Sequence, residues 1–156
     1  MYDRILQFST DIEKRFYDAY MGYIQDLYSN KKVFYEGKYP NLLPQLALKN
    51  RVKTIKESGG LRTVIHRIDF GMVLNGKVIL FEIDGPEHYS NVNGNYYNTD
   101  FVRITNERKI ERDLVLEGYE IYKFMNQDIN NRNDIELKDY LGDFFNKLFK
   151  KHNIKI

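Results

Sequence analysis

The sequence predicts an α/β fold in which a mixed β-sheet with a central hairpin is flanked by helices on both faces. Two strand-like runs, Ile65–Leu74 and Lys77–Asp84, flank Asn75-Gly76, a dipeptide that favours a two-residue type I′ turn. A helical segment then separates the hairpin from a further strand-like run at Tyr119–Phe124. Such a crossover makes its two strands parallel, and helices before, between and after the strands can cover both faces.

The first helix is expected from about Thr10 to Tyr28. Thr10 followed by Glu13 matches a capping box, so helix capping is the simplest role for Glu13. Apolar residues at three- and four-residue spacing predict the buried face: Phe8, Ile12, Phe16, Tyr20, Ile24 and Leu27.

A short strand is expected at Gln45–Leu48, directly after Pro44. The basic, glycine-bearing stretch Arg51–Arg62 is expected to be an exposed loop, either a solvated surface or a phosphate contact. After the hairpin, Ser90–Thr99 is polar and is expected to be a mobile surface loop.

A second helix is expected from about Asp100 to Glu117, with a break near Thr105-Asn106 and Gly118 as its C′ residue. Its inner face should carry Ile110, Leu114 and Val115.

Asn133 with Glu136 predicts the capped start of a last helix, and His152 in the basic tail is expected to be solvated. The core stripe of this helix is Leu137, Leu141, Phe144, Phe145 and Leu148.

The hairpin turn sets a register in which Asp69 faces Glu82 and Arg67 faces Asp84, with all four side chains on one face. Two carboxylates about 5 Å apart repel by roughly 3 kcal/mol at an effective dielectric near 20. Such a pair persists if one carboxyl is protonated, if cations neutralise it, or if a metal lies between the two. An ion-pair cluster in which Arg67 serves both aspartates is an equal alternative. The opposite face of the hairpin is apolar: Phe70, Met72, Ile79, Phe81 and Ile83.

The 156 residues fit one domain, 1–156, that can bury its own core. No apolar run approaches the roughly 20 residues of a membrane span and no signal-peptide pattern is present, so a cytoplasmic protein without a membrane partner is expected. The absence of cysteine excludes a disulfide framework, a thiolate zinc site and a thiol nucleophile. A net charge of +2 does not by itself indicate a nucleic-acid binder.

The order of elements and the pattern IDF, FEIDGPEH and RDLVLEGYEIYKF resemble the PD-(D/E)xK nuclease superfamily. Within it, the chain is similar to the small single-domain group of very-short-patch-repair-like endonucleases, over about residues 9–129. The matching features are Glu13, Pro44-Gln45, Ile68-Asp69-Phe70, Glu82-Ile83-Asp84-Gly85, His88, Arg112-Asp113 and Gly118–Phe124.

The resemblance implies a restriction-endonuclease-like core and a metal-dependent endonuclease that hydrolyses phosphodiester bonds in DNA. The implied cofactor is Mg²⁺, with Mn²⁺ as a substitute. Asp69 and Glu82 would be metal ligands, joined by the Ile83 carbonyl. Asp84 stands where the superfamily often has lysine, and would instead add a ligand or pair with Arg67, which leaves the general base open.

Two further catalytic residues follow from the same resemblance. Glu13 would approach the metal through water, and His88 would act on the nucleophile or the leaving group. A non-catalytic nucleic-acid-binding module, an RNA-directed nuclease and a salt-bridged structural domain stay open, as does a homodimer or larger nuclease complex. DNA phosphates would be bound by Arg62, Arg103, Arg108, Lys109 and Arg112, with Lys77 and the basic tail.

Overall fold

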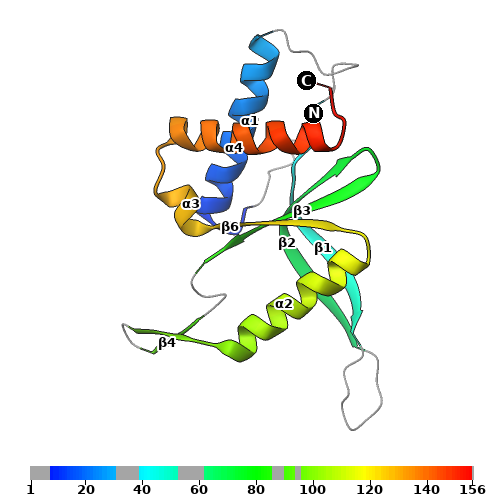
Figure 1. Cartoon of the computed structure of the whole chain (residues 1–156). Coiled ribbons are helices and arrows are strands. Elements are labelled where there is room, and N and C mark those ends of the chain that lie inside the picture. The colour runs from blue at the N-terminus through cyan, green and yellow to red at the C-terminus, as the bar shows by residue number, and fades with distance from the viewer. Residues whose placement is uncertain (1–7, 31–38, 53–61, 86–89, 94–95, 156) are drawn as a thin grey trace, which may run out of the picture.

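The computed structural model describes residues 8–30, 39–52, 62–85, 90–93 and 96–155. It is an α/β structure with an open four-stranded sheet of order β1-β2-β3-β6 (Figure 1). Strands β1 (Leu43–Val52), β2 (Arg62–Leu74) and β3 (Lys77–Asp84) are antiparallel neighbours, and β6 (Glu120–Met125) runs parallel to β3. The expected mixed sheet is confirmed.

The central hairpin forms as expected. Asn75 and Gly76 have φ values of 46° and 78°, and a type I′ turn requires positive φ at both positions. The strand pairing from Phe70–Phe81 to Leu74–Lys77 matches the predicted register. The predicted apolar face is buried throughout: Phe70, Met72, Ile79, Phe81 and Ile83.

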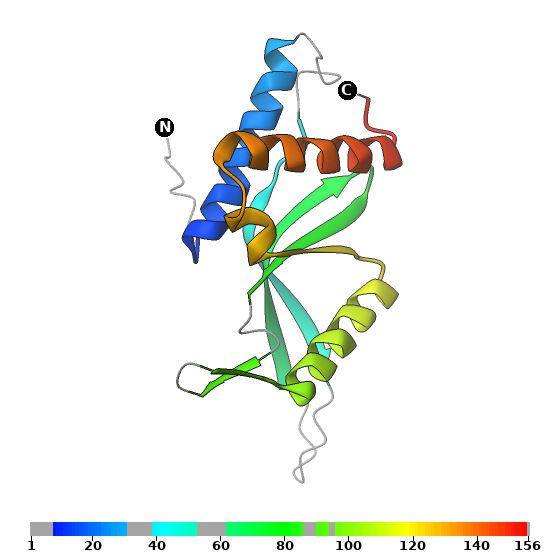
Figure 2. The same cartoon turned by 60° about the vertical axis from the view of Figure 1, so that its left-hand side comes forward.

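Helices lie on both faces of the sheet (Figures 1 and 2). On one face, α1 (Asp11–Ser29), the short α3 (Asn126–Asn130) and α4 (Asp134–Lys151) enclose an aromatic core. Phe16 of α1 is at its centre, with ring centroids 5.2 Å from Phe70 and 5.0 Å from Phe124. On the other face, α2 (Phe101–Leu116) covers a second, smaller core made of Ile68, Leu80 and Leu114.

The helix ends confirm the capping signals. The Thr10 side chain accepts a hydrogen bond from Glu13 N–H, and Asn133 with Glu136 forms a capping box. Gly118 has a φ of 101°, and the following Tyr119 N–H donates to the Leu114 carbonyl at 3.1 Å, which closes the end of α2.

Strand β1 is longer than expected, beginning at Leu43 and ending at Val52. It lies at the edge of the sheet, where a proline such as Pro44 is tolerated because a missing N–H costs no ladder bond on the open side. The predicted loop Arg51–Arg62 is therefore wrong at both ends, since Arg51 belongs to β1 and Arg62 begins β2. Its residues 53–61 lie outside the described part of the chain.

Three further expectations need correction. The loop predicted at Ser90–Thr99 contains two antiparallel strands, β4 (Ser90–Asn93) and β5 (Tyr96–Thr99), because β-favouring residues such as the directly opposed Val92 and Tyr97 outweigh the polar composition. Helix α2 has no break, and Thr105 Oγ1 donates to the Phe101 carbonyl at 2.7 Å. Val115 is 53% exposed and does not belong to the inner face.

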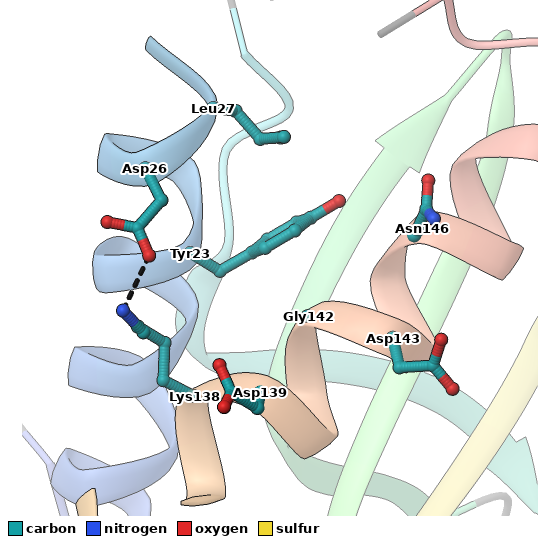
Figure 3. Close-up of a pocket in the computed structure, with 8 residues that line it drawn as sticks. All are labelled: Tyr23, Asp26, Leu27, Lys138, Asp139, Gly142, Asp143 and Asn146. Atoms are coloured by element: carbon teal, nitrogen blue, oxygen red, sulfur yellow. Dashed lines mark hydrogen bonds and ion pairs between the residues drawn. The ribbon is translucent and has the colours of Figure 1, made fainter. Parts of the chain in front are cut away.

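A cavity of about 330 Å³ lies where α1 and α4 cross (Figure 3). Its walls include the Tyr23 ring and an ion pair at 2.5 Å between Lys138 and Asp26. The Tyr23 hydroxyl is buried without a hydrogen-bond partner among the described residues, and burial raises its pKa to about 12. Gly142 sits against this ring, so the two helices approach closely here.

We expect Gly142→Ala to destabilise the protein. A Cβ atom at this position would lie 2.8 Å from Tyr23 Cδ2, so the ring has to move, at a cost of about 1–3 kcal/mol. Helix propensity alone would favour alanine by about 1 kcal/mol. Urea denaturation measures the difference, with the exposed Asn146→Ala on the same helix as control. A Gly142→Ala protein more stable than wild type would show that packing does not require glycine.

Candidate functional site

Asp69 lies where the β2–β3 ladder ends. The last registered pair is Phe70 with Phe81, and beyond it Asp69 Oδ2 accepts a hydrogen bond of 2.7 Å from Ile83 N–H. The carboxylate thus takes the place that a main-chain carbonyl would have in a continued ladder. The prediction placed Asp69 directly opposite Glu82. Because the register of the described strands stops at Phe70–Phe81, these two residues do not form such a pair.

Glu82 and Asp84 share one lysine from the neighbouring strand. Lys123 of β6 is registered with Glu82, and its Nζ lies 2.9 Å from Glu82 Oε2 and 3.5 Å from Asp84 Oδ2. The side chain of Asp84 is 2% exposed and that of Lys123 is 17% exposed. Opposite charges at such distances attract by on the order of 4 kcal/mol at an effective dielectric near 20. The ammonium therefore offsets the repulsion between two carboxylates on the same side of β3.

The sequence reasoning assigned Lys123 no role, although a signal was present. A cation inside the strand pattern YEIYKF needs a partner, and the predicted parallel crossover already placed this strand beside the second hairpin strand. The missing information was the register, which pairs Glu82 with Lys123 and Asp84 with Met125.

Arg67 does not have the role considered for it. Its side chain is exposed, and within the described residues it forms no ion pair with Asp69 or Asp84. The predicted cluster in which Arg67 serves both aspartates is therefore wrong, and among the described residues Lys123 forms an ion pair with Asp84. The strand pair Arg67–Asp84 is also absent from the described register, because the β2–β3 ladder has already ended.

Glu13 is buried, with 5% of its surface exposed. Its Oε2 accepts hydrogen bonds from Ser9 N–H at 2.9 Å and from Gln45 Nε2 at 2.7 Å. The capping role is confirmed at the start of α1, with Ser9 rather than Thr10 as the main-chain donor. A water-mediated approach of Glu13 to a metal stays a prediction.

Asp69, Glu82 and Asp84 lie at the carboxyl end of β3, and with the Lys123 ammonium they carry a formal charge of −2. Hard oxygen donors with this charge suit Mg²⁺, which needs one or two carboxylates beside water and substrate phosphate. Among the described residues, no group of three or more His, Cys, Asp or Glu side chains is arranged to hold a metal ion. Any cation here would therefore draw on water or phosphate oxygen atoms as well.

The predicted phosphate-binding residues lie in several elements. Arg108, Lys109 and Arg112 are exposed on α2, where Arg108 forms an ion pair of 2.9 Å with Glu111. Arg62 begins β2 and Arg103 belongs to α2, while His88 lies outside the described residues. The acidic residues of α2 offset much of its positive charge, so phosphate binding by this helix stays a prediction: Glu107, Glu111 and Asp113.

A separate polar cluster joins the start of β6 to the end of α4. Glu120 Oε1 lies 2.6 Å from Lys151 Nζ and accepts a hydrogen bond from the Tyr122 hydroxyl, while Oε2 lies 3.2 Å from His152 Nε2. The His152 side chain is only 12% exposed, so the expectation of a solvated histidine is wrong. The end of α4 packs against the start of β6 and covers the His152 side chain.

We expect this cluster to make folding pH-dependent. Burial acts to raise the pKa of Glu120, but the hydrogen bonds from Lys151 and Tyr122 outweigh it and hold the pKa below its usual 4.5. A carboxyl with a lowered folded-state pKa stabilises the folded protein above the unfolded pKa, and this contribution is lost as the pH falls through the folded value. Thermal unfolding between pH 7 and about pH 3 should therefore show a smaller loss of stability in Glu120→Gln than in wild type.

The exposed Asp139→Asn on α4 serves as the control for this pH series. It should keep the wild-type dependence of stability on pH. Equal slopes for Glu120→Gln and wild type would contradict the role of Glu120.

Comparison with protein-family models, with curated proteins and with solved structures found no match to this chain. Within the described residues, none of the helices has the length and apolar character needed to cross a membrane.

Proposed function

We propose that this chain is a Mg²⁺-dependent endonuclease that hydrolyses phosphodiester bonds in DNA, on a restriction-endonuclease-like core. The observation that carries this proposal is the contact of Lys123 with both Glu82 and Asp84. Asp84 stands where the resembled nuclease superfamily often has lysine. A lysine from β6 reaches the same acidic group, which supports a site containing both carboxylates and an ammonium.

Each side chain has a distinct part in this proposal. Asp69 and Glu82 would hold the cation, and the hydrogen bond from Ile83 N–H keeps Asp69 directed at the end of β3. Bound Mg²⁺ would supply an activated water and polarise the scissile phosphate. The Lys123 ammonium, with three donors, would bind a phosphate oxygen and stabilise negative charge that develops there.

Substrate binding would depend on phosphate contacts from the exposed cations of α2, Arg108, Lys109 and Arg112. Contacts of this kind orient the nucleic acid without reading its sequence, and they weaken as salt is added. The main contribution of the fold to catalysis would then be to hold the scissile phosphate in a fixed orientation relative to the acidic side chains.

Incubation with supercoiled plasmid, single-stranded DNA and RNA tests the proposal. Plasmid should be nicked or linearised with Mg²⁺ or Mn²⁺ and stay intact with EDTA. Metal-dependent cleavage of RNA alone would show an RNA-directed nuclease. Binding without cleavage of any substrate would overturn the catalytic proposal.

A second candidate is a nucleic-acid-binding module without catalysis. The ion pairs of Lys123 favour it, because an ammonium already balances part of the charge of Glu82 and Asp84 without a metal. This candidate predicts salt-sensitive DNA binding that EDTA does not change. Calorimetry with Mn²⁺ separates the two, since only the nuclease should bind the ion, and Glu82→Gln should weaken that binding.

A further inference from the structure

Gln45 faces Asp69 at a gap in the pairing of β1 with β2. On either side of it Pro44 is registered with Phe70 and Leu46 with Ile68, and within these described strands the remaining residues of β1 are also registered. The register is the same before and after the gap, so no residue is inserted. Gln45 has a φ of 53°, in the left-handed region that a side chain disfavours.

Strand β2 changes faces at this point. Phe70 belongs to the core beneath α1 and α4, whereas Ile68 belongs to the core beneath α2. Residues two positions apart share a face in a regular strand, so the chain must rotate at Asp69 between them. Leu46, the partner of Ile68, packs against the same second core, which shows that β1 follows this rotation.

The rotation explains where the Asp69 carboxylate lies. A side chain on either face of a regular sheet cannot replace a ladder bond, because main-chain N–H groups point along the sheet towards the next strand. Asp69 Oδ2 nevertheless accepts from Ile83 N–H of β3 at 2.7 Å. The carboxylate must therefore extend towards β3 within the sheet.

A partly buried hydrogen bond holds Gln45 in its disfavoured conformation. Its Nε2 donates to Glu13 Oε2 at 2.7 Å, and Glu13 is itself bound by Ser9 N–H at the start of α1. Hydrogen bonds to a carboxylate are among the stronger ones in proteins, so this one can offset the cost of a positive φ. Helix α1 is thereby linked through Gln45 to the turn of β1 opposite Asp69.

We propose that Gln45 is a positioning residue for Asp69. Its bond to Glu13 fixes the left-handed turn of β1, and this turn directs the Asp69 carboxylate to Ile83 N–H. Glu13 then acts as the anchor of Gln45. The consequence for catalysis rests on the proposed nuclease function, whereas the positioning does not.

The amide proton of Ile83 measures the positioning directly by NMR, without metal or DNA. Gln45→Met keeps the length of the side chain but has no donor, and Gln45→Gly accepts the positive φ without strain. In Gln45→Met the Ile83 amide resonance should move, and its hydrogen exchange should become at least about tenfold faster, as expected for loss of a bond to a carboxylate. In Gln45→Gly, where the positive φ has no steric cost, the Ile83 signal should change less than in Gln45→Met. The Ile79 amide in the regular part of β3 is the internal control and should change little.

Glu13→Gln is the conservative control, because its amide oxygen still accepts from Gln45 and should leave the Ile83 signal close to that of wild type. An unchanged Ile83 resonance and exchange rate in folded Gln45→Met would overturn the proposal. Unfolding of both variants would also overturn it, since Gln45 would then support the whole fold rather than one carboxylate.

Cleavage assays separate this inference from the nuclease proposal. If the protein is a nuclease, Gln45→Met should lower kcat by about 10–100-fold with little change in KM for DNA, as expected for a displaced metal ligand. A changed Ile83 signal in a protein that cleaves nothing would leave positioning intact and reject the nuclease. Wild-type kcat together with an unchanged Ile83 signal in Gln45→Met would reject positioning and retain the nuclease.

Discussion

Asp69→Asn and Glu82→Gln are each expected to lower Mg²⁺-dependent DNA cleavage by at least about 10³-fold while the protein stays folded. Each change removes a negative charge from the group at the carboxyl end of β3, where a cation would be held. Asparagine can still accept the hydrogen bond from Ile83 N–H, so the geometry of Asp69 is retained. The initial rate of plasmid nicking and the thermal unfolding midpoint are the two measurements.

Asp139→Asn is the matched control for these variants, because it neutralises an exposed carboxylate on α4. It should keep wild-type cleavage and stability. If Asp69→Asn and Glu82→Gln both unfold instead, the carboxylates belong to a structural ion-pair network and the catalytic proposal fails.

Lys123→Met is expected to lower the free energy of unfolding by about 3 kcal/mol at neutral pH. Methionine fills a similar volume but removes the ammonium that lies between Glu82 and Asp84. Because the Asp84 side chain is only 2% exposed, water cannot replace the lost cation effectively. Urea denaturation at constant pH gives the size of the effect.

The double variant Lys123→Met/Asp84→Asn separates stability from catalysis. Neutralising Asp84 removes the repulsion that Lys123→Met exposes, so most of the lost stability should return. Cleavage should stay impaired, because the proposed phosphate contact of Lys123 is still missing. Wild-type stability in the single variant would show that these ion pairs contribute little to folding.

Local sequence patterns predicted much of the fold correctly. The Asn75-Gly76 turn, the Thr10 and Asn133 caps and the end of α2 at Gly118 all occur as expected. Each depends on hydrogen bonds or φ values within a few residues, so neighbouring sequence is enough to specify it. The parallel strand after α2 followed from the same reasoning, since a helical crossover permits little else.

Prediction of the candidate site was less complete. Asp69, Glu82 and Asp84 were identified as an acidic group, but the predicted pairing of Asp69 with Glu82 assumed that the hairpin ladder continues past Phe70. No local pattern showed that the ladder ends there. The β2–β3 ladder ends beside Asp69, and the positive φ of Gln45 lies opposite Asp69 on a different strand.

The sequence by itself determined the hairpin, the main helices and the chemical character of the site, because these follow from periodicity and from residues close together in the chain. Only the tertiary structure decided that Lys123 pairs with Glu82 and Asp84, and that Asp69 accepts a hydrogen bond from Ile83 N–H. Both contacts join separate strands, so strand register and the reversal of faces at Asp69 specify them. The physical reason is that a charge pairs with whichever opposite charge the packed sheet brings within a few ångströms, at any separation along the chain.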